Sequence, residues 1–167
     1  MYRLADQPGA NASEMAQSVI MNRPCAIRDL SNAGTRTRGS VVSVQTDTVI
    51  CELEFDLVVA DADPIKVSAY LRYDVRDPFA VCVSFDAGTA DRIEWTFARE
   101  LLDEGLWQAT GEGDVKVWPK GMSIVFALCS PSGRAVLETP RQPMASFVAQ
   151  TMRLVPTGQE EAFIDLD

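Results

Sequence analysis

Apolar and polar residues alternate along residues 51–59 of the chain. The apolar positions are Cys51, Leu53, Phe55, Leu57 and Val59, and the positions between them are Glu52, Glu54, Asp56 and Val58. A period of two with acids on the second face is typical of a half-buried antiparallel strand. The three acids could also bind a cation, but a solvated strand face is the interpretation we favour.

Six more strands are predicted, and the one over 115–118 is described below with the helices. After a turn at 61–64, the second runs over 66–73. The third carries Phe79, Val81, Val83 and Phe85 on one face, and the fourth turns Ile93, Trp95 and Phe97 inward after a turn at 86–89. Residues 123–129 are nearly all apolar, which indicates a central strand that is buried on both faces. A hairpin turn at 130–133 leads into a returning strand over 134–138.

Two helices are expected among these strands. Residues 98–104 suit two helical turns, and Gly105 is predicted to end them in the left-handed conformation. Residues 111–114 form a turn into a strand over 115–118, which Pro119 ends. A longer helix opens at Pro140 or Pro143 and ends before Pro156. One stripe of this helix carries Met144, Phe147, Val148 and Thr151.

This order of elements predicts an α+β fold. It consists of a mainly antiparallel β-sheet or open barrel, with a short internal helix and a longer C-terminal helix. Residues 158–167 form an acidic tail, and residues 1–46 form an N-terminal extension that we expect to be partly disordered. A short helix over 14–21, capped by Ser13, is predicted within that extension.

A basic segment lies within the extension. Its four arginines are Arg23, Arg28, Arg36 and Arg38, and its one acid is Asp29. Such an arm can tether nucleic acid or anionic lipid. The segment has no aromatic residue to stack on bases, so we favour a solvated leader over a tether.

Composition narrows the classes of function. The chain has 167 residues, a formal charge of −9 and 47% hydrophobic residues, which suits one domain plus an extension. An acidic surface repels a phosphate backbone and steers toward basic partners, so nucleic acid is not the expected ligand. The chain has no histidine. This absence removes Ser-His-Asp and Cys-His nucleophiles and imidazole-bound zinc, so an enzyme is disfavoured.

The cysteines point to a reducing compartment. Cys25, Cys51, Cys82 and Cys129 include no Cys-x-x-Cys pair, and the last three lie in apolar strand patterns as expected for buried free thiols. No metal or other cofactor is expected. No segment approaches the roughly 18 apolar residues of a membrane span, and the N-terminus lacks a secretory layout. We therefore expect a cytoplasmic protein.

Three candidate chemical motifs have simpler explanations. The Gly-Glu-Gly-Asp sequence at 111–114 precedes a strand, whereas a glycine-rich phosphate loop leads into a helix, so a turn is favoured. The serines at 130–133 have no histidine base, which leaves turn formation as their role. Asp74 and Asp77 lie beside Arg72 and Arg76. A glycosidase-like acid pair needs one raised pKa in a cleft, so a solvated salt-bridge cluster is the default.

Three tryptophans fall within residues 92–119. Trp95 lies on the inward beat of its strand and is predicted to be core. Trp107 follows the short helix, and Trp118 lies on the face opposite the valines at 115 and 117. Exposed aromatic residues beside turns are favoured anchors for protein partners. Trp107 and Trp118 are therefore the candidate protein interface, with plain packing as the alternative for both.

Several sequence motifs together resemble one known family. They are Leu71-Arg-Tyr-Asp74, Asp77-Pro-Phe-Ala-Val81, Glu94-Trp-Thr-Phe-Ala-Arg-Glu-Leu-Leu102, Gly105-Leu106, Gly111, Gly113-Asp-Val-Lys-Val-Trp-Pro119 and Ser130-Pro-Ser-Gly133. Over residues 47–157 this pattern resembles the SsgA-like family, the sporulation and cell-division regulators of actinobacteria. The final Phe-Ile-Asp-Leu-Asp is similar to the tail of the sporulation member that recruits the division GTPase FtsZ.

The resemblance carries expectations about fold and function. It implies a fold related to the Whirly-type domains that bind single-stranded nucleic acid, assembled as a trimer, and it implies no catalysis. Members are expected to position FtsZ or peptidoglycan-remodelling proteins at septum sites, through contacts with division proteins or with another SsgA-like protein. A single-stranded nucleic-acid-binding module is the alternative.

Overall fold

A computed structural model describes residues 41–86, 92–131 and 133–164 of the chain. The strands are β1 (Val41–Gln45), β2 (Thr48–Leu57), β3 (Ile65–Asp74), β4 (Ala80–Asp86), β5 (Ile93–Ala98), β6 (Val115–Lys120), β7 (Ser123–Ser130) and β8 (Gly133–Pro140). The helices are α2 (Arg99–Gly105), α3 (Arg141–Leu154) and the single 3-10 turn η1 (Glu160–Phe163). The predicted helix over 14–21, the arginine arm and most of the turn at 86–89 lie outside the described residues.

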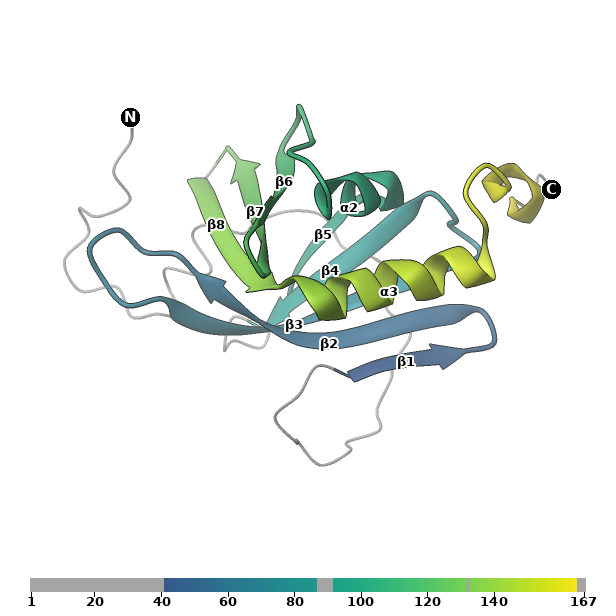
Figure 1. The fold of residues 1–167 in the computed structure, drawn as a ribbon, viewed down its shortest axis with the longest axis horizontal. Coiled ribbons are helices and arrows are strands. Elements are labelled where there is room, and N and C mark those ends of the chain that lie inside the picture. The colour runs from purple at the N-terminus through teal and green to yellow at the C-terminus, as the bar shows by residue number, and fades with distance from the viewer. Residues whose placement is uncertain (1–40, 87–91, 132, 165–167) are drawn as a thin grey trace.

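The described strands form one antiparallel sheet, in the order β5-β4-β3-β2-β8-β7-β6, and β1 also pairs with β2. β1 and β8 share one edge of β2. The first half of β2 pairs with β1, in a register from Val41 opposite Glu52 to Gln45 opposite Thr48. Only Asp56 and Leu57 pair with β8. The sheet is therefore curled into a half-barrel, as Figure 1 shows, and the predicted α+β fold with a mainly antiparallel sheet is confirmed.

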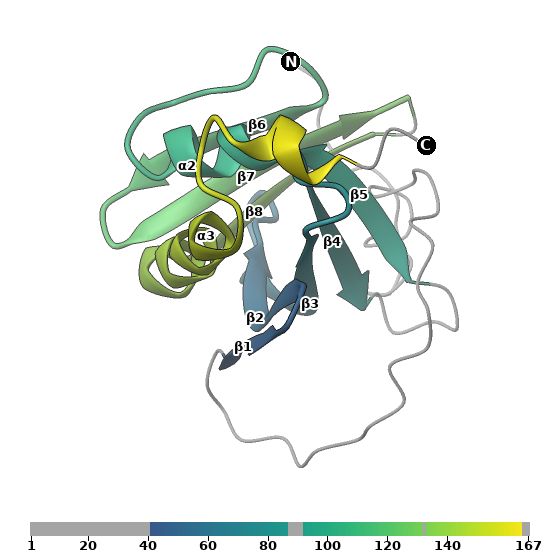
Figure 2. The ribbon, with the colours of Figure 1, turned by 90° about the vertical axis from the view of Figure 1, so that its right-hand side faces the viewer.

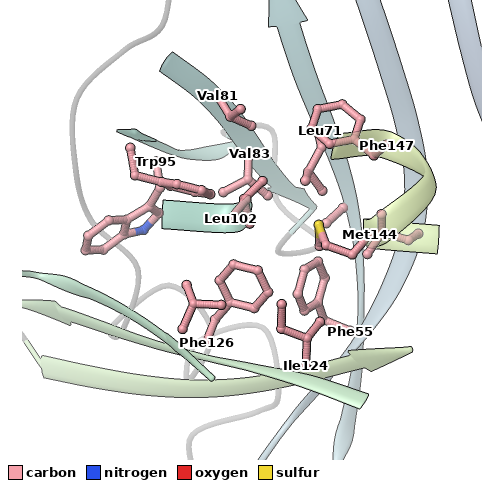
Figure 3. Packing of buried hydrophobic residues seen from close by; sticks show 14 of the residues in the cluster. Phe55, Leu71, Val81, Val83, Trp95, Leu102, Ile124, Phe126, Met144 and Phe147 are labelled. Carbon is pink, nitrogen blue, oxygen red and sulfur yellow. The ribbon is translucent and has the colours of Figure 1, made fainter. Parts of the chain in front are cut away.

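The hydrophobic core lies inside this curl. Phe55 of β2 contacts Phe126 of β7 edge to face, with ring centroids 5.5 Å apart, and so joins the two arms of the sheet. Figure 3 shows both rings beside Ile124, with Met144 between them and Phe147 and with Trp95 at the border of the cluster. Trp95 is 6% exposed, so its predicted place in the core is confirmed.

α3 closes the open side of the half-barrel. In Figure 2 it is seen end-on between the β7–β8 hairpin and the β1–β2 hairpin, and it packs against β1, β2 and β7. Its buried face is the predicted stripe of Met144, Phe147, Val148 and Thr151. The period of 3.6 residues that identified this stripe in the sequence is therefore the period that buries it.

The structure corrects three predicted details. Phe79 precedes β4 and is 49% exposed, although the alternation placed it on the buried face. Pro119 lies inside β6 opposite Ile124 and does not end the strand. β6 is the edge strand of the sheet, where a residue without an N–H is tolerated. Gly105 is not left-handed: it is the last residue of α2, and Leu106 continues in right-handed helical geometry.

Residues 41–45 belong to the predicted N-terminal extension, and in the structure they form β1. Two of the β1 valines are largely exposed, Val41 at 56% and Val44 at 49%, while Val42 packs against the core. The sheet therefore begins earlier in the chain than the predicted strand at 51–59.

Candidate protein-binding surface

Gly105 fixes the position of α2 against β6. A β-carbon built on Gly105 would lie 2.7 Å from the Cβ of Val117 and closer still to its Cγ1. Real β-carbons do not approach other carbon atoms so closely, so only glycine lets the end of α2 pack on Val117. The motif glycine thus serves helix-to-strand packing and not the helix stop that the sequence suggested.

The segment after α2 is anchored at both ends. Its start is held by the amide of Trp107, which donates to the carbonyl of Glu104 at 2.9 Å, and by the buried side chain of Leu106. At its end, Thr110 and Val117 exchange two backbone hydrogen bonds of 2.9 and 3.0 Å. The Thr110 hydroxyl also donates to the carboxylate of Glu104 at 2.7 Å. The backbone that carries Trp107 is therefore held in place by contacts within the chain itself.

The Trp107 side chain is 73% exposed. The guanidinium carbon of Arg141, at the start of α3, lies 4.6 Å from its ring centroid, which is a cation–π contact. The backbone amide of Arg141 donates to the carbonyl of Met122 at 2.9 Å, and Met122, in the β6–β7 turn, is 87% exposed. We call Trp107, Met122 and Arg141 the Trp107 surface, because these bonds bring three separate segments of the chain together there.

Trp118 does not join this surface. It is half-buried in β6, opposite Val125 of β7. Successive side chains of a strand point to opposite faces, and the neighbouring Val117 faces α2. Trp118 therefore points away from α2, whereas Trp107 lies at the end of that helix. Of the two predicted interface residues, Trp107 is largely exposed and Trp118 is half-buried.

Asp74 is the centre of an ion-pair cluster at the end of β3. Its carboxylate accepts hydrogen bonds from Arg72 at 2.5 Å and from Arg76 at 2.6 and 2.8 Å, and it also accepts the Arg76 backbone amide. The Arg76 hydrogen bonds lower the pKa of Asp74 to about 2. A carboxyl group with a lowered pKa is not a general acid, and Asp77 contributes only backbone hydrogen bonds here. The predicted salt-bridge cluster is present, although Asp74 is buried and not solvated.

Arg99 is a residue that the sequence reasoning missed. It is 3% exposed, and its guanidinium donates to the carbonyl of Val155 at 2.7 Å and to the hydroxyl of Tyr73 at 3.2 Å. It also binds the carboxylate of Glu160 in η1. A signal was present, since Arg99 continues the inward beat of Ile93, Trp95 and Phe97. We call this arrangement the Arg99 clasp, because it fastens the start of the tail to the end of α3.

Other kinds of site are not formed by the described residues. Within residues 41–86, 92–131 and 133–164, no group of three or more His, Cys, Asp or Glu side chains is placed to hold a metal ion. None of the helices there combines the length and apolar character that a bilayer crossing requires. Burial raises the pKa of the Cys51 thiol to about 12, so this cysteine is an unreactive core residue.

Comparison with known proteins gives consistent matches. The family model described as "Streptomyces sporulation and cell division protein, SsgA" matches residues 67–160. The sporulation-specific cell division protein SsgB of Streptomyces coelicolor is 48% identical over 124 residues, which cover 72% of this chain and 90% of that protein. SsgB of Thermobifida fusca is 41% identical over 72% of this chain and 90% of its own length.

Two solved structures share the fold. One is a structure of SsgB, whose mutations correlate with longitudinal cell division during sporulation of Streptomyces coelicolor. It superposes with a TM-score of 0.68 and 42% identity, covering 73% of this chain and all of that one. The other is the SsgA-like sporulation-specific cell division protein from Thermobifida fusca. It has a TM-score of 0.67 and 39% identity over 75% of this chain and 95% of its own.

Proposed function

The chain belongs to the SsgA family of sporulation and cell division proteins, and from this premise we propose that it acts as a non-catalytic adaptor in sporulation-linked septation. In this role it positions FtsZ or peptidoglycan-remodelling proteins at septum sites from the cytoplasm, through protein contacts. Its family membership supports the process, and the Trp107 surface supports the mode of action.

The observation that carries the proposal is the fixed exposure of Trp107. Tryptophan, arginine and methionine are enriched at protein interfaces, and tryptophan and arginine dominate their binding energy. A backbone that is already fixed avoids part of the ordering cost of association. Trp107 and its Arg141 partner therefore form the contact that we expect to matter most in partner binding.

A second line of support comes from the chemistry of the described residues. The absence of histidine from the sequence removes the commonest general base. Asp74, which has a perturbed pKa, is engaged by two arginines, and its pKa is shifted toward the ionised form. These features fit an adaptor better than a carboxylate-based hydrolase.

The test combines cell biology with a pull-down. The gene is deleted in its sporulating host and complemented with the wild type, with Trp107→Ala, or with Phe79→Ala as the matched control. Phe79 is also an exposed aromatic residue, at 49%, but it lies outside the Trp107 surface. We expect septum spacing to be restored by the wild type and by Phe79→Ala, and not by Trp107→Ala. We expect the same order in pull-downs of FtsZ or other septal proteins.

Normal septation in the deletion strain would end the proposal. Full complementation by Trp107→Ala would leave the adaptor role open to other surfaces but would remove this one. Abundance of each variant must be matched by immunoblot, because loss of folding also reduces complementation.

A further inference from the structure

The C-terminal segment has a chemistry that its own domain does not use. Phe163 and Ile164 are 40% and 37% exposed, and the sequence continues Asp165-Leu166-Asp167. Apolar and acidic residues alternate from Ile164 to Asp167. The Arg99 clasp holds only the start of this segment, through Glu160, whose carboxylate also accepts the amide of Gly158 at 2.7 Å. The exposed parts of Phe163 and Ile164 are therefore available to a partner.

The Trp107 surface offers the complementary chemistry. Trp107 and Met122 supply exposed apolar area, at 73% and 87%. The guanidinium of Arg141 lies on the Trp107 ring, and no carboxylate of residues 41–86, 92–131 and 133–164 forms an ion pair with it. The nearby Lys120, by contrast, is already paired with Glu138 at 2.8 Å. Arg141 is thus a cation left for an incoming acid on a chain whose net charge is −9.

The tail of the same molecule lies at the wrong end of α3 for this contact. Arg141 begins α3, and Val155, which shares Arg99 with Glu160, follows its end. At about 1.5 Å per residue the two ends of the helix are roughly 20 Å apart. Figure 1 shows η1 beyond the C-terminal end of α3, away from the end where β8 enters the helix. Asp165 and Asp167 lie within three residues of Ile164, a span of about 10 Å at most, so either carboxylate can reach Arg141 only from a second molecule.

We propose that the Trp107 surface binds residues 163–167 of a second copy of the chain. Phe163, Ile164 or Leu166 packs on Trp107 and Met122, and a carboxylate of Asp165 or Asp167 pairs with Arg141. This contact joins different patches of the two copies, so it is head-to-tail and can close a ring or extend a chain of subunits. It rests on the binding role of the Trp107 surface in the proposed function, and it names the segment that occupies that surface.

The first experiment measures binding of a fluorescein-labelled peptide with the sequence of residues 158–167 to the full-length protein. Fluorescence anisotropy is recorded for the wild type, Trp107→Ala and Arg141→Gln, with Arg153→Gln as the matched control at the opposite end of α3. We expect about tenfold weaker binding for Trp107→Ala and about fivefold for Arg141→Gln, with Arg153→Gln equal to the wild type. A peptide carrying Asp165→Asn and Asp167→Asn is expected to bind the wild-type protein about as weakly as the unchanged peptide binds Arg141→Gln.

The second experiment tests the direction of the contact by sedimentation velocity. Trp107→Ala removes the surface, and the triple variant Ile164→Ala, Asp165→Asn, Leu166→Ala removes the tail. Each variant alone is expected to sediment as a monomer, whereas their mixture forms a dimer because one copy still has the surface and the other still has the tail. Trp107 is largely exposed and Ile164 is partly exposed, so we expect circular dichroism of each variant to match the wild type.

Three results would overturn the inference: no binding of the peptide to the wild type, equal binding to Trp107→Ala, or identical sedimentation of the variants and the wild type. Failure of the proposed function gives a different result, namely normal septation in the deletion strain although the peptide binds the wild type and not Trp107→Ala. Conversely, lost septation with peptide binding unchanged would assign the surface to another partner and overturn the tail contact.

Discussion

The guanidinium of Arg99 lies over the ring of Tyr73, 5.3 Å from its centroid, and donates to its hydroxyl at 3.2 Å. The Tyr73 hydroxyl in turn donates to the carbonyl of Pro78 at 3.2 Å. Through this pair the end of β3, the start of α2 and the segment after α3 meet at one buried charge. The pair explains how a short internal helix and a C-terminal helix are held in fixed positions on one curled sheet.

Removal of the Arg99 charge should destabilise the domain strongly. Arg99→Met keeps most of the apolar stem but removes the donor to the carbonyl of Val155 and the cation that pairs with Glu160. Breaking a buried ion pair on one side typically costs about 3–5 kcal/mol. Urea unfolding should show this loss. Arg153→Met, at an exposed arginine that donates to the side-chain oxygen of Gln150, should change the free energy of unfolding by less than about 0.5 kcal/mol. Equal free energies of unfolding for the two variants would mean that the Arg99 clasp does not stabilise the domain.

Two motif glycines should differ in their tolerance of alanine. Gly105→Ala places a methyl group against Val117 and should cost about 1–3 kcal/mol, since overpacking forces the end of α2 away from β6. Gly113→Ala meets no atom within 4 Å and needs no left-handed backbone, so its effect should be small. Thermal unfolding of both variants decides the point. A shift of the Trp107 fluorescence in Gly105→Ala alone would show that this packing also positions the tryptophan.

Acid should weaken the fold through Asp74. Hydrogen bonds from Arg76 lower its folded-state pKa from 3.8 to about 2. A carboxyl group with a lowered folded-state pKa contributes stability above its unfolded pKa, and this contribution is lost as pH falls through the folded value. Wild-type stability should therefore drop between about pH 4 and pH 2, and Asp74→Asn should reduce that drop.

The Asp74 variant has a second readout at neutral pH. There, Asp74→Asn should cost about 1–3 kcal/mol, because charge-assisted hydrogen bonds to Arg72 and Arg76 become neutral ones. Chemical denaturation at a series of pH values measures both effects. If the variant loses as much stability between about pH 4 and pH 2 as the wild type, other carboxylates account for the acid sensitivity. Glu138 and Glu160, whose pKa values are also lowered, are examples.

The tryptophans should separate binding from stability. Trp107 is 73% exposed, so Trp107→Ala should leave the free energy of unfolding within about 0.5 kcal/mol of the wild type while it weakens partner binding. Trp95 is 6% exposed in the core, and Trp95→Ala should cost about 3–5 kcal/mol. Denaturant titrations of the two variants form a matched pair. A large loss of stability in Trp107→Ala would instead favour plain packing for this residue.

The sequence predicted those parts of the fold in which local periodicity and burial agree. The alternation in β2 and the stripe of α3 are such cases, because neighbouring side chains there face a single core. Phe79 and Pro119 depended on where a strand starts and on which strand forms the edge of the sheet, and no local pattern carries that information. The sequence predicts a left-handed helix stop at Gly105, because the contact that requires glycine, Val117, belongs to the next strand and becomes close only after folding.

The candidate site was predictable only in part for the same reason. The sequence identified Trp107 as an aromatic residue after a helix, but it could not place Arg141 on its ring, since α3 reaches that point through tertiary packing. The inward beat of β5 does extend to Arg99. A charged residue at an inward-facing position usually indicates that the strand has ended, unless a buried partner for the charge is known. The partner here, Glu160, lies 61 positions away in the sequence, so no local pattern reveals it.

The narrow contact between β2 and β8 determines the order in which parts of the chain fold. Its bonds join residues that are far apart: the Thr139 hydroxyl donates to the carbonyl of Glu54, 85 positions earlier, and the Val58 amide donates to the carbonyl of Val136 at 2.8 Å. The hairpins on either side form locally, whereas this contact closes a long loop, which slows its formation. We expect the β1–β5 meander and the β6–β8 meander to form first, each by itself. The two meanders then dock on each other in the last step. In hydrogen exchange, the Val58 amide should therefore open before the amides inside either meander.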